Sequence, residues 1–90
     1  MRIYKYPIQK GRNAFGNFTI EMPEVFQFLD VKEQDGTAYI WAMVDETTKP
    51  KKIEFRVCAT GDPVVTNKWA FIKTFHQEPF VWHLFQVHNG

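Results

Sequence analysis

Serine is absent from this chain of 90 residues, and cysteine occurs only once. Every mechanism that depends on a serine nucleophile is therefore excluded. The single cysteine, Cys58, has no partner for an intramolecular disulfide, so the cysteine content gives no sign of a secreted disulfide scaffold. The strongest helix formers are scarce too, because Leu, Ala and Met together number 10.

Residues that favour β-strands are abundant. Val, Ile, Phe, Tyr, Trp and Thr account for 36 of the 90 residues. The length suits one domain, and 44% hydrophobic with 23% charged residues is typical of a globular chain. We therefore predict a single all-β domain over residues 1–90, with little or no helix.

Alternation of apolar and polar residues locates the first strands. Lys52–Ala59 alternates cleanly and predicts a half-buried strand. Arg2–Ile8 alternates less cleanly, and Pro7 lacks the N–H that a central strand donates, so this strand is expected at a sheet edge. Phe18–Met22 predicts a short strand that ends before a proline.

A hairpin is predicted around Asp35-Gly36, which separates the apolar runs Val25–Glu33 and Thr37–Asp45. Both arms carry apolar residues on both faces, so we expect central strands covered on both sides. A helix over residues 23–30 is the alternative, because Pro23-Glu24 suits a first helical turn. The aromatic and β-branched residues of this segment favour the strand.

A last hairpin is expected from Trp69–Phe75 and Phe80–His88, after a turn at residues 60–63. Together these segments give about seven short strands. The predicted fold is a small antiparallel sandwich or a partly open barrel.

Charge is nearly balanced, at +1 with a pI near 7.9, which argues against a duplex-DNA binder. Residues 1–12 hold four cations and no acid, residues 21–46 hold seven acids against Lys32, and residues 49–56 hold four cations against Glu54. Two interpretations stay open: a solvated surface of mixed charge, or basic patches that bind a small anion or pair between subunits.

Neither secretion nor a membrane location is expected. Met1–Pro7 is charged where a signal peptide would be apolar, and the longest stretch without a charge, Pro79–Gly90, is too short to span a bilayer. We expect an intracellular protein.

Metal or cofactor binding and catalysis find little support. His83 and His88 are five residues apart on one predicted strand, so they point to opposite faces and cannot share a metal. Cys58 with His76 or His83 could form a nucleophilic pair only through the fold, and His83 is expected to be hydrogen-bonded and half-buried. The loop Gly11–Gly16 lacks the Lys-Ser/Thr of a P-loop, which leaves a plain connector or an anion contact by Arg12.

Aromatic residues make up 17% of the chain, more than a core of this size buries comfortably. Three interpretations remain: a purely internal role, an interface between copies of the chain, or stacking on nucleotide bases beside lysine and arginine.

Eight short segments, taken in order, carry a resemblance to known proteins. They are Ile3-Tyr4-Lys5-Tyr6-Pro7, Ile20-Glu21-Met22-Pro23, Asp35-Gly36, Trp41-Ala42-Met43-Val44-Asp45, Phe55-Arg56-Val57, Thr60-Gly61-Asp62-Pro63, Phe71-Ile72-Lys73-Thr74-Phe75 and Val81-Trp82-His83-Leu84-Phe85. Together they resemble a family of small uncharacterised bacteriophage and prophage proteins. The chain departs from that family's pattern at Gln86, where the family has Glu.

The resemblance implies an accessory protein of the host cytoplasm that counters a host defence by stoichiometric binding rather than as an enzyme. The leading hypothesis is a homo-oligomer that sequesters a nucleotide-derived anion, without cofactor or metal, in a pocket between subunits. The rival is an inhibitor that presents its acidic segment, residues 21–46, to a host defence or nucleic-acid protein. The candidate ligand-binding residues are Arg2, Tyr4, Lys5, Tyr6, Arg12, Lys52, Arg56, Trp69, Trp82 and His83.

Overall fold

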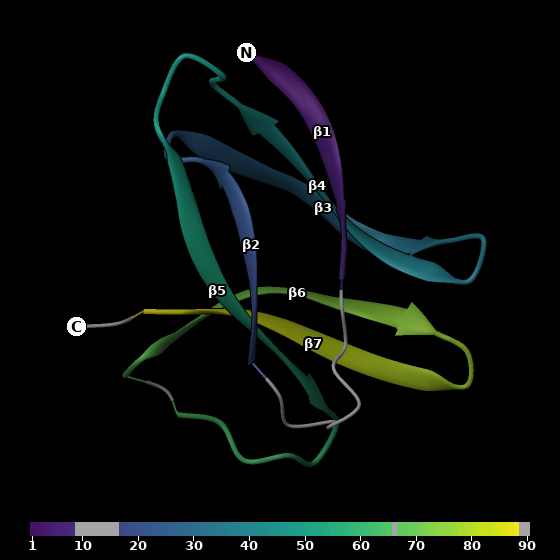
Figure 1. The fold of residues 1–90 in the computed structure, drawn as a ribbon. Coiled ribbons are helices and arrows are strands. Elements are labelled where there is room, and N and C mark those ends of the chain that lie inside the picture. Colours follow the sequence, from purple (N-terminus) through teal and green to yellow (C-terminus); the bar gives the residue numbers. More distant parts are fainter. Residues whose placement is uncertain (9–16, 66, 89–90) are drawn as a thin grey trace.

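The computed structural model describes residues 1–8, 17–65 and 67–88 (Figure 1). These residues form two antiparallel sheets, one of three strands in the order β1-β4-β3 and one of four in the order β2-β5-β7-β6. The strands are β1 (Arg2–Pro7), β2 (Asn17–Pro23), β3 (Phe26–Gln34), β4 (Thr37–Val44), β5 (Pro50–Ala59), β6 (Trp69–Gln77) and β7 (Phe80–Val87).

The predicted fold class is confirmed. The described part of the chain is all-β, with seven antiparallel strands and no helix, and its two sheets do not close into a barrel. The alternative of a helix over residues 23–30 is wrong, because β3 occupies most of this segment. Phe26 and Phe28 both pack against the shared core from this strand, which a helix would not allow at a spacing of two.

The hairpin between β3 and β4 turns where the sequence indicates. Asp35 and Gly36 both have positive φ, 51° and 85°, the left-handed backbone that a tight two-residue hairpin turn requires. Asp tolerates this region better than most residues, and Gly has no Cβ to oppose it.

The core lies between the inner faces of the two sheets. On β4 the inward positions are Ala38, Ile40, Ala42 and Val44, all buried. On β5 the fully buried Phe55 contacts the ring of Phe18 at 5.5 Å and that of Phe28 at 5.9 Å. Because Phe28 belongs to the other sheet, this group of rings joins the two layers. Figure 1 shows β6 and β7 below the layer formed by β1, β4 and β3.

The expectation that β3 and β4 are central strands covered on both sides is wrong. β4 is central, but β3 is the last strand of its sheet in the hydrogen-bonded order. Only the inner face of β4 packs on the second sheet. Its outward residues Tyr39, Trp41 and Met43 are half-buried, and no described element covers them.

Ile40 and Ile3 offer a matched test of this one-sided burial, since the first is 0% exposed and the second 64% exposed in the same sheet. We expect Ile40→Val to lower the free energy of unfolding by about 0.5–1.5 kcal/mol, because removing one methylene from this buried side chain leaves a small cavity in the core. Ile3→Val should change it by less than about 0.5 kcal/mol. Urea unfolding of both variants measures the difference, and equal losses would contradict the assigned faces.

Candidate ligand-binding face

The outer surface of the three-stranded sheet combines rings from β4 with lysines from the strands on either side. Lys5 of β1 lies opposite Trp41, and Lys32 of β3 lies opposite Tyr39. Directly paired residues of antiparallel strands share a face. We call this surface the open face; it consists of Ile3, Lys5, Leu29, Lys32, Tyr39, Trp41 and Met43.

Each lysine lies over the ring diagonal to it. The Nζ of Lys5 is 4.6 Å from the centre of the Tyr39 ring, and the Nζ of Lys32 is 5.6 Å from that of Trp41. The two rings touch edge to face, with centres 5.7 Å apart and planes at 63°. Such cation–π contacts at exposed sites contribute about 0.5–1 kcal/mol each, weak enough for a ligand to replace.

A hollow of about 360 Å³ opens on this face. Its apolar lining comes from Ile3, Leu29 and Trp41, and its polar lining from Asp30, Lys32 and Gln34. Ile3 is 64% and Leu29 is 45% exposed. Alternation along β3 places Leu29 on this side, and the register shift between Phe28 and Asp30 brings Asp30 to the same side, opposite Trp41.

The charge of the open face is positive. Its hollow has one acid, Asp30, whose carboxylate is paired with Lys73 of β6 and also accepts the N–H of Val31 at 2.8 Å. The hydrogen bond from Lys73 lowers the pKa of Asp30, and the nearby charge of Lys32 lowers it further. The carboxylate is therefore ionised, and the ammonium of Lys73 balances its charge. Neither Lys5 nor Lys32 forms an ion pair with a described residue; Lys5 donates only to Gln34 Oε1, at 2.8 Å.

Of the candidate residues that the structure describes, Lys5 alone lies on the open face. Arg2, Tyr4 and Tyr6 alternate with it along β1 and point to the other side. The Nε of Arg2 lies 2.6 Å from a carboxylate oxygen of Glu46, and the hydroxyl of Tyr4 donates to the same carboxylate. These groups hold the edge of the sheet to the turn after β4.

The outer face of the four-stranded sheet carries Lys52, Arg56, Trp69 and His83. The guanidinium of Arg56 lies 5.1 Å from the Trp69 ring centre and donates to Asn17 Oδ1 at 2.8 Å. The predicted pairing of arginine and aromatic ring therefore exists, but the two groups bind each other.

Acids balance the cations on this second face. The amide of Asn17 donates to Glu54 Oε2 at 2.9 Å, and Lys52 lies opposite Glu21 in the strand register. Compared with the open face, this face offers less uncompensated positive charge to a phosphate.

The remaining candidates lie apart. Trp82 belongs to β7 and packs against the core, with its ring centre 5.3 Å from that of Phe80. Arg12 and the loop Gly11–Gly16 lie outside the described residues.

Cys58 and His83 are direct cross-strand partners, yet their geometry does not form a nucleophile and its base. Both ring nitrogens of His83 are engaged, Nε2 with Thr60 Oγ1 at 2.9 Å and Nδ1 with Thr74 Oγ1 at 2.8 Å. Burial raises the pKa of the Cys58 thiol, which opposes formation of a thiolate. The prediction of a hydrogen-bonded, half-buried His83 is confirmed. Within the described ranges, no three His, Cys, Asp or Glu residues gather as metal ligands would.

Three acids of the segment 21–46 are engaged within the chain. Glu46 pairs with Arg2, Asp30 pairs with Lys73, and Asp45 accepts the hydroxyl of Thr47 at 2.6 Å. Two of the seven acids are thus neutralised by cations of the same chain, and their charge is not available to a basic partner.

Sequence reasoning missed most of the open face, namely Ile3, Leu29, Lys32, Tyr39 and Trp41. The sequence did contain one indication of this face. In the segment 37–44, two of the inward residues are alanines, whereas the outward residues are Tyr39, Trp41 and Met43. When a strand has large side chains on one face and small side chains on the other, the face with the large side chains is a candidate binding surface.

Comparison with known proteins identifies the family. The profile of the domain of unknown function DUF7352 matches residues 1–90. The chain belongs to this family. No curated protein and no solved structure matches the chain significantly. Within the part of the chain that the structure describes, no helix has the length and apolar character to cross a membrane.

The buried thiol yields a direct prediction, simplified by its being the only cysteine. Cys58 is 3% exposed and its pKa is raised, so we expect it to react with Ellman's reagent at pH 8 only when the fold opens. The reaction should be complete in denaturant and slower by orders of magnitude in buffer. Rapid stoichiometric labelling of the native protein would refute this and revive a catalytic thiol.

Proposed function

We propose that this protein acts by stoichiometric, non-catalytic binding, and that the open face holds a ligand containing a flat ring and an anionic group, such as a nucleotide derivative. The observation that carries the proposal is the uncovered outward side of β4, where two lysines without carboxylate partners lie over two rings. A base takes the place of a lysine over Trp41, and the released ammonium moves to the phosphate.

The interactions available are of the right strength. Stacking of a base on an aromatic side chain contributes about 1–3 kcal/mol. A charge-assisted hydrogen bond contributes about 1.5–3 kcal/mol. One stacked base and two lysine–phosphate contacts, with the apolar contribution of Ile3 and Leu29, support micromolar binding after the cost of association is subtracted.

Size favours a small ligand over a protein partner at this face. The hollow of about 360 Å³ falls in the usual range for small-molecule sites, about 300–1,000 Å³. Three strands spaced about 4.8 Å apart and six residues long cover roughly 300 Å². A stable protein complex needs about 800 Å² from each partner. We therefore expect two copies to join through this face only when a ligand lies between them.

The biological role we propose follows the resemblance to bacteriophage proteins. A binding protein without turnover counters a host defence by removing its nucleotide signal from solution. The hydrogen-bonded state of His83 and the raised pKa of Cys58 support binding without hydrolysis.

Isothermal titration with cyclic dinucleotides and ADP-ribose derivatives tests the proposal. We expect Trp41→Leu to weaken binding roughly fivefold to a hundredfold, because it removes the ring and keeps an apolar side chain. Lys32→Gln should weaken it as well. The matched controls are Trp69→Leu and Lys52→Gln, which make the same changes on the other sheet and should leave affinity within about twofold.

Other outcomes discriminate among the alternatives. Loss of binding in Arg56→Ala but not in Trp41→Leu would move the site to the four-stranded sheet. Absence of heat across the whole panel would overturn the nucleotide proposal. Mass spectrometry of the ligand after long incubation should recover it unaltered, and a cleaved product would show an enzyme instead.

A further inference from the structure

A second hollow, of about 200 Å³, lies on the four-stranded sheet and takes no part in the open face. It is formed where β5 begins and β7 ends, and it is more polar than apolar. Its lining residues are Lys51, Lys52, Ile53, Glu54, Gln86, Val87 and His88.

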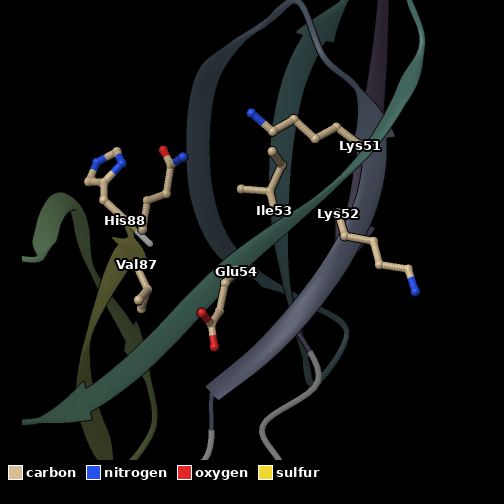
Figure 2. A pocket seen from close by; sticks show the side chains of 7 residues that line it. Lys51, Lys52, Ile53, Glu54, Val87 and His88 are labelled. Atoms are coloured by element: carbon tan, nitrogen blue, oxygen red, sulfur yellow. The ribbon is translucent and has the colours of Figure 1, made fainter. Parts of the chain in front are cut away.

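The side chains around this hollow point to different sides of β5. Figure 2 shows the side chain of Lys51 extending from β5 toward the side on which His88 lies at the end of β7, with Ile53 on the same side of β5 as Lys51. Lys52 and Glu54 project elsewhere, as the alternation along β5 requires. The ammonium and the imidazole thus share one side of the hollow, away from the carboxylate.

The charge of Lys51 has no acidic partner in the hollow. The side chains of Lys51 and His88 make no hydrogen bond or ion pair with the described residues. The carboxylate of Glu54 already accepts a hydrogen bond from Asn17, 2.9 Å away on the outer face. The local potential near Lys51 is therefore positive.

The backbone that carries these groups is held in place. The N–H of His88 donates to the carbonyl of Lys68 at 2.7 Å, which fixes the end of β7. Lys51 lies opposite Met22 in the register of β2 and β5, and Met22 is buried. A ligand between Lys51 and His88 therefore meets donors whose main-chain positions are already set.

We propose that this hollow binds a small oxyanion of the phosphate class, held between Lys51 and His88 with the Gln86 amide as a further donor. Lysine supplies three N–H donors, glutamine two and imidazole one or two. Inorganic phosphate at neutral pH presents four oxygens, of which one or two carry a proton and the others act only as acceptors. The volume is below the usual range of about 300–1,000 Å³ for drug-sized ligands, which favours an ion or a single phosphoryl group over a nucleotide.

Titration with inorganic phosphate, followed by ¹H–¹⁵N NMR at constant ionic strength, tests this site. We expect saturable shifts of the backbone amides of residues 51–54 and 86–88. Lys51→Gln should weaken binding about tenfold or more, because it removes a charge-assisted donor. His88→Gln should weaken it too. A parallel titration with a phosphomonoester distinguishes free phosphate from a phosphoryl group, according to which binds more tightly.

Lys49→Gln is the matched control, since it removes the same charge two residues earlier from a side chain that does not line the hollow. It should leave the affinity within about twofold. Equal losses in Lys49→Gln and Lys51→Gln, with both spectra still native, would show diffuse electrostatic attraction and overturn the site. Shifts that never saturate would do the same. Neither result bears on Trp41, because the two sites lie on different sheets.

Discussion

Two small sheets packed face to face have only one interior, and β4 has apolar side chains on both of its faces. The inward residues Ala38, Ile40, Ala42 and Val44 fill the available space against the second sheet. Tyr39, Trp41 and Met43 are left on the outside by geometry, whatever their hydrophobicity. Burial of the first set stabilises the domain, and incomplete burial of the second set leaves apolar surface that a ligand can cover.

The lysines of the open face reduce the exposure of Tyr39 and Trp41 to water. Lys5 and Lys32 lie over the rings, so their methylene stems and ammonium groups shield aromatic surface from water. In the binding mode proposed above, the same side chains supply the positive charge that contacts the anionic group. The second face is different, because hydrogen bonds link Arg56 to Asn17 and Asn17 to Glu54 beside Trp69. Rings beside cations occur on both sheets, but only one sheet leaves the cations available.

The fold followed from local rules that act within a strand or a turn. Alternation along Lys52–Ala59, Pro7 near the end of an edge strand, and positive φ at Asp35-Gly36 each depend on neighbouring residues alone. The candidate site could not be predicted from these local rules, because its composition depends on which strands become neighbours in the sheet. Lys5 and Lys32 lie far apart in sequence and come to one face only because β1 and β3 both pair with β4. Likewise, only the tertiary structure reveals that Arg2 and Tyr4 are engaged by Glu46.

Two of the four edge strands, β1 and β2, carry features that oppose the addition of a further strand. β1 carries Arg2 and Lys5 and ends at Pro7, while β2 carries Glu21 and ends at Pro23. Prolines and charges on such strands hinder the addition of a further strand from another molecule, which is how sheets grow into amyloid. Growth of the sheets by strand addition is therefore opposed at these two edges, where the backbone would otherwise be open to another chain.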